Sequence, residues 1–277
     1  MPISKITKQI MNRLNNALTQ PWKLKMEPYQ VVPNVYYVGN KYVGSYLFNT
    51  DKGIILIDVG MQETAYLLFE SIRKIGFSPE DIKTILISHG HIDHCGAARL
   101  VQEYSKSGIL FPQGDAFFLT ERRDLILRDD LVPSFEIKGY YDYGKFMNFG
   151  NVEILPVITP GHTPGCTSFI IKVASGDKII TLGMHGGLGL NGLTKAELKE
   201  KGLALDLQEK YLKSLQSIRE EKVDIVIPSH ASHFPGDYFA IAAKNDGTGK
   251  VLMIPHAWQN LMDDRIRQIK EIIEHDN

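Results

Sequence analysis

The chain has 277 residues, of which 43% are hydrophobic, and this is enough to bury one large core or two small ones. With 31 Lys and Arg against 32 Asp and Glu, the formal net charge is -1, so no broad electrostatic field attracts nucleic acid or an anionic membrane. The composition therefore indicates a soluble globular protein that acts on a small-molecule substrate, with no nucleic-acid partner and no membrane partner.

The N-terminal 25 residues predict an amphipathic helix. Apolar side chains recur at helical spacing between residues 4 and 18, and Ser4 is a candidate cap; they are Ile6, Ile10, Met11, Leu14 and Leu18. This helix is expected to pack either on the body of the same chain or on a partner subunit, and a homodimer is left open. The segment has no uninterrupted apolar run of the kind found in signal peptides, so we expect a cytoplasmic protein.

The first half of the chain after Pro21 and Pro28 reads as short strands followed by alternating helices and strands. Strands are predicted at 35–38, 43–48, 53–58, 82–87 and 108–112, and helices at 63–75, 97–106 and 114–122. Residues 122–143 are irregular and rich in aromatic side chains, and we expect a long loop there, of the kind that covers a pocket.

The second half repeats this organisation. Strands are predicted at 152–158, 167–174, 178–182 and 223–227, and helices at 205–221 and 258–274. No linker or low-complexity segment divides the halves, so residues 26–277 are expected to form one domain. Two β-rich halves that each supply helices predict an α/β (α+β) fold in which two sheets lie face to face with helices outside.

The segment 88–96 carries the strongest chemical signal. It follows an apolar strand and holds His89, His91, Asp93 and His94 within six residues. Imidazole and carboxylate are the usual ligands of zinc, and packing so many ionisable groups together is costly unless a cation holds them. We therefore predict a metal site in the loop after this strand.

Two further histidines share this context, because His162 and His230 each follow an apolar strand directly. Strand ends that carry ligands can converge on one edge of a sandwich, so both residues are candidates for the same metal site. Cys95 and Cys166 lie beside these motifs, and two cysteines are too few for a secreted disulfide framework. We expect both to be free thiols that behave as small buried hydrophobic side chains.

These motifs are similar to those of the metallo-β-lactamase superfamily. The resemblance rests on His89-x-His91-x-Asp93-His94, on Gly161-His162-Thr163-Pro164-Gly165 and on the distal His230, and it covers about residues 30 to 235. The turn Asp58-Val59-Gly60 fits the early Asp-x-Gly element of that family. The resemblance implies a four-layer αββα sandwich with a hydrolytic site for one or two metals at the sheet edge.

Carried over residue by residue, the resemblance implies two zinc sites. The first would be bound by His89, His91 and His162, and the second by Asp93, His94 and His230. Asp93 would also orient the attacking water. Asp58 would steady the ligand loop from behind, as metal sites commonly require.

The chain departs from many members of the family after the strand at 178–182, where no bridging Asp follows. This is unlike the lactonase, glyoxalase II and tRNA-processing branches, and it is similar to the β-lactamase subclass with an Asp-His-His second site, which predicts a weaker second site. That subclass usually has Ser hydroxyls here, whereas this chain has Met184 and His185, which we expect in the substrate loop. His185 and His233 have no assigned role.

The leading prediction is a zinc-dependent hydrolase that opens a cyclic amide or ester, with a β-lactam as the first candidate substrate. A lactone or thioester hydrolase is one alternative, and an iron-dependent oxidoreductase on the same scaffold is another, although His91 argues against a di-iron site. A non-catalytic binder, in which Met184 closes the pocket, is also kept. The near-neutral charge disfavours a nuclease.

Overall fold

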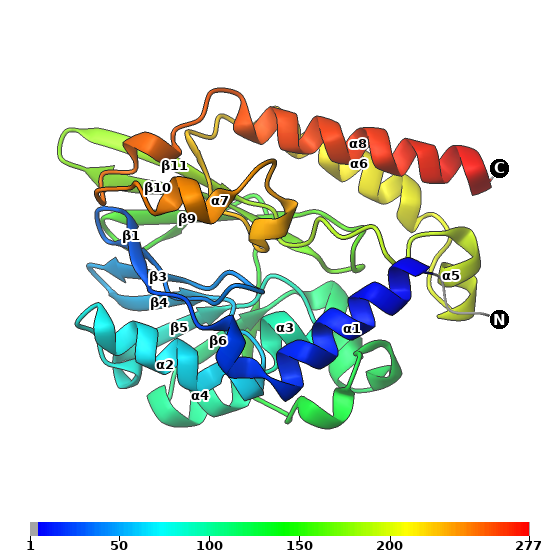
Figure 1. Ribbon diagram of the computed structural model, residues 1–277, viewed down its shortest axis with the longest axis horizontal. Helices are drawn as coiled ribbons and strands as arrows, with labels where there is room; N and C mark the ends of the chain where they lie inside the picture. The colour runs from blue at the N-terminus through cyan, green and yellow to red at the C-terminus, as the bar shows by residue number, and fades with distance from the viewer. Residues whose placement is uncertain (1–4, 277) are drawn as a thin grey trace.

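The computed structural model describes the backbone of residues 5–276 and the side chains of residues 12–276. The predicted cap at Ser4 and the side chains of Ile6, Ile10 and Met11 lie outside the described residues. Figure 1 shows two stacked sheets, with helices covering the outer face of each. This arrangement confirms the predicted αββα sandwich.

The first sheet contains seven strands in sequence order. They are β1 (Tyr29–Val32), β2 (Val35–Tyr37), β3 (Tyr46–Thr50), β4 (Gly53–Ile57), β5 (Ile82–Leu86), β6 (Gly108–Phe111) and β7 (Ile137–Tyr140). Strands β1 to β4 form an antiparallel meander, and β4 to β7 are parallel. Because parallel strands end at the same edge of the sheet, the residues after β4, β5 and β6 come together.

The second sheet has the strand order β12-β11-β10-β9-β8. Its strands are β8 (Met147–Asn148), β9 (Val152–Ile158), β10 (Thr167–Ser175), β11 (Lys178–Met184) and β12 (Ile225–Val226). β12 runs parallel to β11, whereas the other pairs are antiparallel.

The helices lie mainly on the outer faces, with α2 and α4 below the first sheet and α6 and α8 above the second in Figure 1. Their bounds are α1 (Lys5–Thr19), α2 (Ala65–Lys74), α3 (Ile92–Cys95), α4 (Ala98–Ser105), α5 (Lys195–Glu200), α6 (Leu207–Arg219), α7 (Tyr238–Ala242) and α8 (Ala257–Asp276). Leu14, Ala17 and Leu18 of α1 are buried in the chain's own hydrophobic core, so α1 packs on the body of the same chain.

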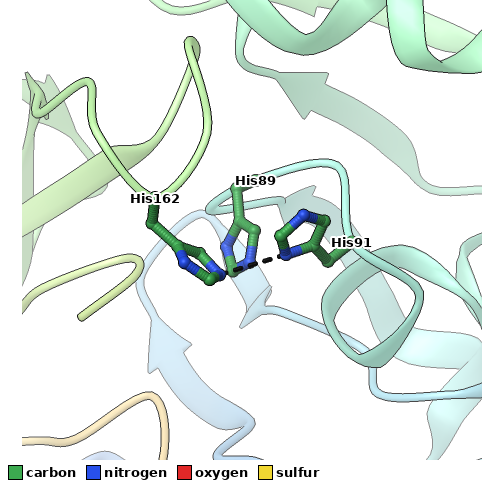
Figure 2. Close-up of side chains that lie close together, drawn as sticks. All are labelled: His89, His91 and His162. Atoms are coloured by element: carbon green, nitrogen blue, oxygen red, sulfur yellow. Dashed lines mark hydrogen bonds between the residues drawn. The ribbon is translucent and has the colours of Figure 1, made fainter. Parts of the chain in front are cut away.

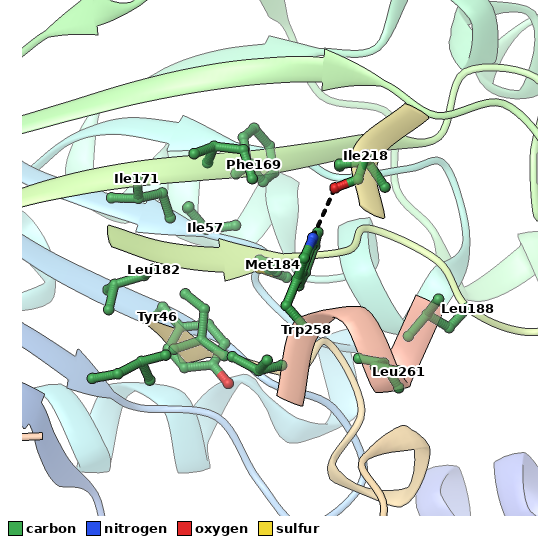
Figure 3. Close-up of a cluster of buried hydrophobic side chains, with 14 of the residues drawn as sticks. Tyr46, Ile57, Phe169, Ile171, Leu182, Met184, Leu188, Ile218, Trp258 and Leu261 are labelled. Carbon is green, nitrogen blue, oxygen red and sulfur yellow. Dashed lines mark hydrogen bonds between the residues drawn. The ribbon is translucent and has the colours of Figure 1, made fainter. Parts of the chain in front are cut away.

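Alternating side chains of the strands fill two hydrophobic clusters. On β4, Ile55 and Ile57 face the space between the sheets, whereas Ile54 and Leu56 pack under α2 and α4. Burial on both faces explains why such strands read as continuous apolar runs in the sequence. In the other cluster, Trp258 of α8 packs beside Met184 and donates from Nε1 to the carbonyl of Ile218, 2.8 Å away (Figure 3).

The structure corrects several predicted elements. The segment 122–143 is not a loop throughout, because β7 adds a parallel strand at the edge of the first sheet. The predicted helix at 114–122 is a 3-10 helix, η4 (Gln113–Leu119), and β1 and α5 were not predicted. Short edge elements bury few side chains and therefore leave a weak periodic signal. Within residues 5–276, no helix has both the length and the apolar character needed to cross a membrane.

Candidate metal centre

The loop after β5 carries four of the six predicted ligands. Ser88 and His89 leave the strand, His91 precedes α3, and Asp93 and His94 lie within that short helix. Gly96 ends the helix against the carbonyl of Ile92, where a Cβ would overlap the backbone. This loop and the short helix α3 together direct the four ligand side chains toward the same edge of the sandwich.

The first ligand group consists of His89, His91 and His162, whose side chains converge in Figure 2. Nδ1 of His91 lies 3.1 Å from Nε2 of His162. The ring centroid of His89 lies 4.8 Å from that of His91 and 4.9 Å from that of His162. His162 comes from the loop after β9, so the two sheets each contribute to this group.

Hydrogen bonds behind these rings determine which nitrogen faces the centre. His162 donates from Nδ1 to the carbonyl of Gly189, 2.9 Å away, which leaves the lone pair of Nε2 toward the group. The Ser88 hydroxyl donates to Asp58 and therefore accepts from Nδ1 of His89, at 3.1 Å. Nε2 of His89 is buried and has no hydrogen-bond partner among the described residues, so its lone pair also points into the group.

The second group consists of Asp93, His94 and His230. Nε2 of His94 lies 3.2 Å from Nε2 of His230, and Oδ2 of Asp93 lies 3.4 Å from Nε2 of His230. His94 donates from Nδ1 to Asp58 Oδ2 at 2.7 Å, and His230 donates from Nδ1 to the carbonyl of Tyr42 at 2.7 Å. In both imidazoles the proton is therefore on Nδ1, and the lone pair of Nε2 points into the second group, toward the Asp93 carboxylate.

This donor set fits zinc. Ligand nitrogens 2.0–2.1 Å from a tetrahedral zinc ion lie about 3.3 Å apart, close to the nitrogen separations of 3.1 and 3.2 Å seen in the two groups. Burial, with the charges of neighbouring histidines, lowers the pKa of His89 and His162 well below the ordinary value, and burial lowers the pKa of His91 to about 4. Neutral imidazoles that aim lone pairs at one another repel unless a cation lies between them.

Burial alone would raise the pKa of Asp93, but His94 and His230 hold it well below its ordinary value. Burial alone would lower the pKa of His94, but the negative charges of Asp93 and Asp58 outweigh burial and raise it. The second group therefore combines one ionised carboxylate with two imidazoles.

Asp58 follows β4 in the left-handed region, with a φ of 54°, and its side chain is fully buried. It accepts from the Ser88 backbone N–H at 2.8 Å, from the Ser88 hydroxyl at 2.7 Å and from His94. A non-glycine residue in this region is strained, and the three charge-assisted hydrogen bonds stabilise it there. The structure thus places Asp58 directly behind the ligand loop.

Asp115 is a buried residue that the sequence patterns missed. It lies in η4 and accepts from Gly90 N at 2.9 Å, from Thr163 Oγ1 at 2.7 Å and from Gly165 N at 2.6 Å. It therefore links the loop of His89 and His91 to the loop of His162. Burial raises the pKa of its carboxyl to about 6, although these three hydrogen bonds oppose the shift. The sequence feature that could have pointed to Asp115 is its position just after β6, the parallel neighbour of β5.

The residues expected in the substrate loop are buried. The Met184 side chain has no exposed surface and belongs to the hydrophobic cluster, so it packs in the core and does not line an open pocket. His185 is 2% exposed. Cys95 and Cys166 are free and buried, as predicted, and burial raises the pKa of both thiols, which keeps them protonated.

Comparison with known proteins gives a consistent family. Residues 38–181 match the family model described as the metallo-beta-lactamase superfamily. An N-acyl homoserine lactonase of Bacillus cereus is 28% identical over 168 residues, which make up 50% of this chain and 62% of that protein. The match thus spans less than two thirds of the lactonase. The uncharacterized protein YobT of Bacillus subtilis is 25% identical over 201 residues, 68% of this chain and 82% of that protein.

Among solved structures, the subclass B3 metallo-beta-lactamase BJP-1 of Bradyrhizobium japonicum aligns with a TM-score of 0.80 and 22% identity, covering 93% of this chain and 97% of that one. The metallo-beta-lactamase FEZ-1 of Legionella gormanii aligns with a TM-score of 0.80 and 24% identity, covering 91% of this chain and 97% of that one. At these identities the likeness concerns the fold.

Proposed function

Because this chain belongs to the metallo-beta-lactamase superfamily, as its motifs predicted, we propose that it is a zinc-dependent hydrolase that opens a cyclic amide or ester. The observation that carries the proposal is the convergence of six side chains into two adjacent groups with their ring lone pairs turned inward. His89, His91 and His162 would hold one zinc ion, and Asp93, His94 and His230 would hold a second.

Zinc, when bound, supplies a Lewis acid that polarises a scissile carbonyl and acidifies water. The residues of this chain do the rest. Asp93 stays ionised at neutral pH and accepts a hydrogen bond from the attacking water, which fixes the direction of attack. Asp58 and Ser88 hold the His94 ring in one tautomer, and Asp115 keeps the two ligand loops in register.

A β-lactam is the first candidate substrate. Two observations support it: the chain has no carboxylate in the segment directly after β11, and its solved structural neighbours include B3 metallo-beta-lactamases. Without a carboxylate bridging both groups, the second site is expected to bind zinc more weakly than the first.

A lactone is the second candidate, because N-acyl homoserine lactonases of several Bacillus strains are among the sequence relatives. Both substrates present a strained or activated ring carbonyl, so the same metal centre serves either. The surface around the centre is expected to decide between them. Residence in the cytoplasm, a homodimer and iron in place of zinc stay predictions.

The test begins with elemental analysis of the purified full chain, which is expected to show one to two zinc ions and no stoichiometric iron. The zinc-loaded protein is then assayed on a chromogenic cephalosporin and on an N-acyl homoserine lactone, with and without a chelator. The proposal expects hydrolysis of at least one, abolished by chelation and by His89→Ala. A zinc-loaded protein that hydrolyses neither, nor any thioester, would contradict it.

A further inference from the structure

The loop between β2 and β3, residues 38–45, belongs to the first sheet but contacts the segment that carries His230 from the second. The Gly44 N–H donates to the carbonyl of Ser229 at 2.7 Å. Gly44 also lies so close to this segment that a Cβ on it would come within 2.6 Å of the carbonyl oxygen of Pro228. The loop therefore joins the two sheets at the edge that holds the metal centre.

Tyr42 is the residue of this loop that contacts the ligand. Its carbonyl accepts from Nδ1 of His230 at 2.7 Å, and its ring lies edge-on to the imidazole, with the two ring centroids 5.5 Å apart. Partners of this kind set the tautomer and the orientation of a metal-binding imidazole. A backbone carbonyl points where the backbone directs it, so the orientation of His230 depends on the conformation of residues 40–43.

Asn40 holds this conformation from inside the loop. Its side chain is 5% exposed, and Oδ1 accepts from the Tyr42 N–H at 2.8 Å and from the Val43 N–H at 3.2 Å. The Asn40 N–H in turn donates to the carbonyl of Val43 at 3.0 Å. An Asn side chain that accepts from the N–H two residues later forms an Asx turn, which fixes the backbone between them. One side-chain oxygen atom thus holds the two N–H groups on either side of Tyr42.

The link from Asn40 to His230 passes through a single peptide group. The carbonyl of Tyr42 and the N–H of Val43 belong to one peptide unit, which is planar and trans. In a trans peptide the carbonyl and the N–H point in opposite directions. Because Asn40 Oδ1 accepts from the N–H on one side, the carbonyl on the other side is directed at Nδ1 of His230. Rotation of this peptide would break both hydrogen bonds.

The core holds Asn40 itself in place. Tyr37, whose side chain is 2% exposed, donates from Oη to the carbonyl of Asn40. Gly39 packs so closely inside the loop that a Cβ on it would lie 2.5 Å from the carbonyl oxygen of Val43. The core thus fixes the base of the loop, and the Asn40 side chain fixes its outer part, where Tyr42 lies.

We propose that Asn40 is a positioning residue of the metal centre. Through the peptide between Tyr42 and Val43 it keeps the ring proton of His230 on Nδ1 and directs the Nε2 lone pair into the second group. This inference rests on the proposed function for the role of His230 as a zinc ligand, whereas the orientation of the ring is a property of the chain. The argument uses only the acceptor oxygen of Asn40, which Asp also supplies and Ala does not.

The first experiment observes the His230 ring directly. Proton–nitrogen correlation spectra of the zinc-loaded full chain, with isotope-labelled histidine, measure how fast the Nδ1 proton exchanges with water, and His230→Asn assigns the signal. Asn40→Ala is expected to speed this exchange about tenfold, because the carbonyl that protects the proton is released. Asn40→Asp is expected to exchange like wild type. Asn40→Ser, which forms the same turn more weakly, is expected to lie between Ala and wild type.

The second experiment measures zinc affinity by competition with a coloured chelator. Asn40→Ala is expected to weaken zinc at the second group about tenfold and to leave the first group unchanged, and Asn40→Asp is expected to restore the affinity. Asn148→Ala is the matched control. Asn148 Oδ1 also accepts from a backbone N–H, that of Gly150 at 3.0 Å, but in an exposed turn at the opposite end of β9 from His162. This variant is expected to bind zinc like wild type.

Thermal unfolding establishes which variants are folded, and Asn40→Ser decides the outcome if Asn40→Ala does not fold. Equal proton exchange at His230 in wild type and in the folded variants without the full acceptor would overturn the proposal. A loss that Asn40→Asp fails to restore would overturn it too, since the acceptor oxygen would not be the cause. If wild type binds no zinc at the second group, the proposed ligand set fails. Proton exchange in the chain as purified then still decides whether Asn40 positions His230.

Discussion

The two ligand groups are held in place by different means. In the second group, a buried carboxylate contacts an imidazole directly, since His94 donates to Asp58, while His230 donates to the carbonyl of Tyr42. In the first group, the rings of His162 and His89 donate to neutral acceptors, and the buried carboxylate of Asp115 contacts no imidazole but holds the two ligand loops. The comparison teaches that the buried carboxylate supports ring orientation at the second site and loop register at the first.

The largest effect is expected from removing a ligand of the first group. His162→Ala deletes the one imidazole that the second sheet contributes to this group. The affinity of the first group for zinc is therefore expected to fall by more than about a hundredfold, which is more than the loss of any supporting residue would cause. Elemental analysis after gel filtration measures the bound zinc. Retention of the wild-type zinc content by this variant would contradict the assignment of the first group.

Asp58→Asn tests the direct support of the second group. The amide keeps the shape of the side chain but replaces an ionised acceptor, so His94 loses its charge-assisted hydrogen bond and zinc at the second group is expected to weaken about tenfold to a hundredfold. Competition with a coloured chelator resolves the two affinities. The zinc affinity of the first site is expected to change less than that of the second. An equal loss of affinity at both sites would show that Asp58 does not support the second group specifically.

Asp115→Asn tests the loop support of the first group, with an expected loss of about tenfold in affinity at that site. The same variant has a pH signature. Because folding raises the pKa of Asp115 to about 6, the native state binds its proton more tightly than the unfolded state does. The stabilisation from this proton is present at low pH and is lost as pH rises from about 4 to 6.

The shift of about two pKa units corresponds to roughly 3 kcal/mol. Urea unfolding of wild type and Asp115→Asn between pH 4 and 7 measures this difference, and the variant is expected to gain stability relative to wild type as pH rises. A difference that does not change with pH would show that Asp115 has an ordinary pKa in the folded chain.

Ser88→Ala is expected to have the smallest effect and to act on both groups alike. The hydroxyl donates to Asp58 and accepts from His89, so its loss removes about 1 kcal/mol of support from each, or roughly a fivefold change in zinc affinity. The same chelator competition measures it. A loss confined to one site would show that the two groups do not share this support.

The sequence predicted most of the fold and brought the right side chains to attention. His89, His91, Asp93 and His94 are adjacent in the chain, and His162 and His230 each follow a strand, so their positions rest on local patterns. The structure brings all six together in two groups. The edge strand β7 and the short helix α5 were missed because they bury few residues and so lack a clear period.

The sequence by itself determined the donor chemistry of the centre and the layered fold, because ligand type, ligand spacing and strand periodicity are local properties of the chain. Only the tertiary structure decided what surrounds the centre. Asp115 lies far from the ligand motifs in sequence and meets them through the parallel pairing of β5 with β6 and the approach of the loop after β9. Those contacts depend on long-range packing, which no short stretch of sequence records.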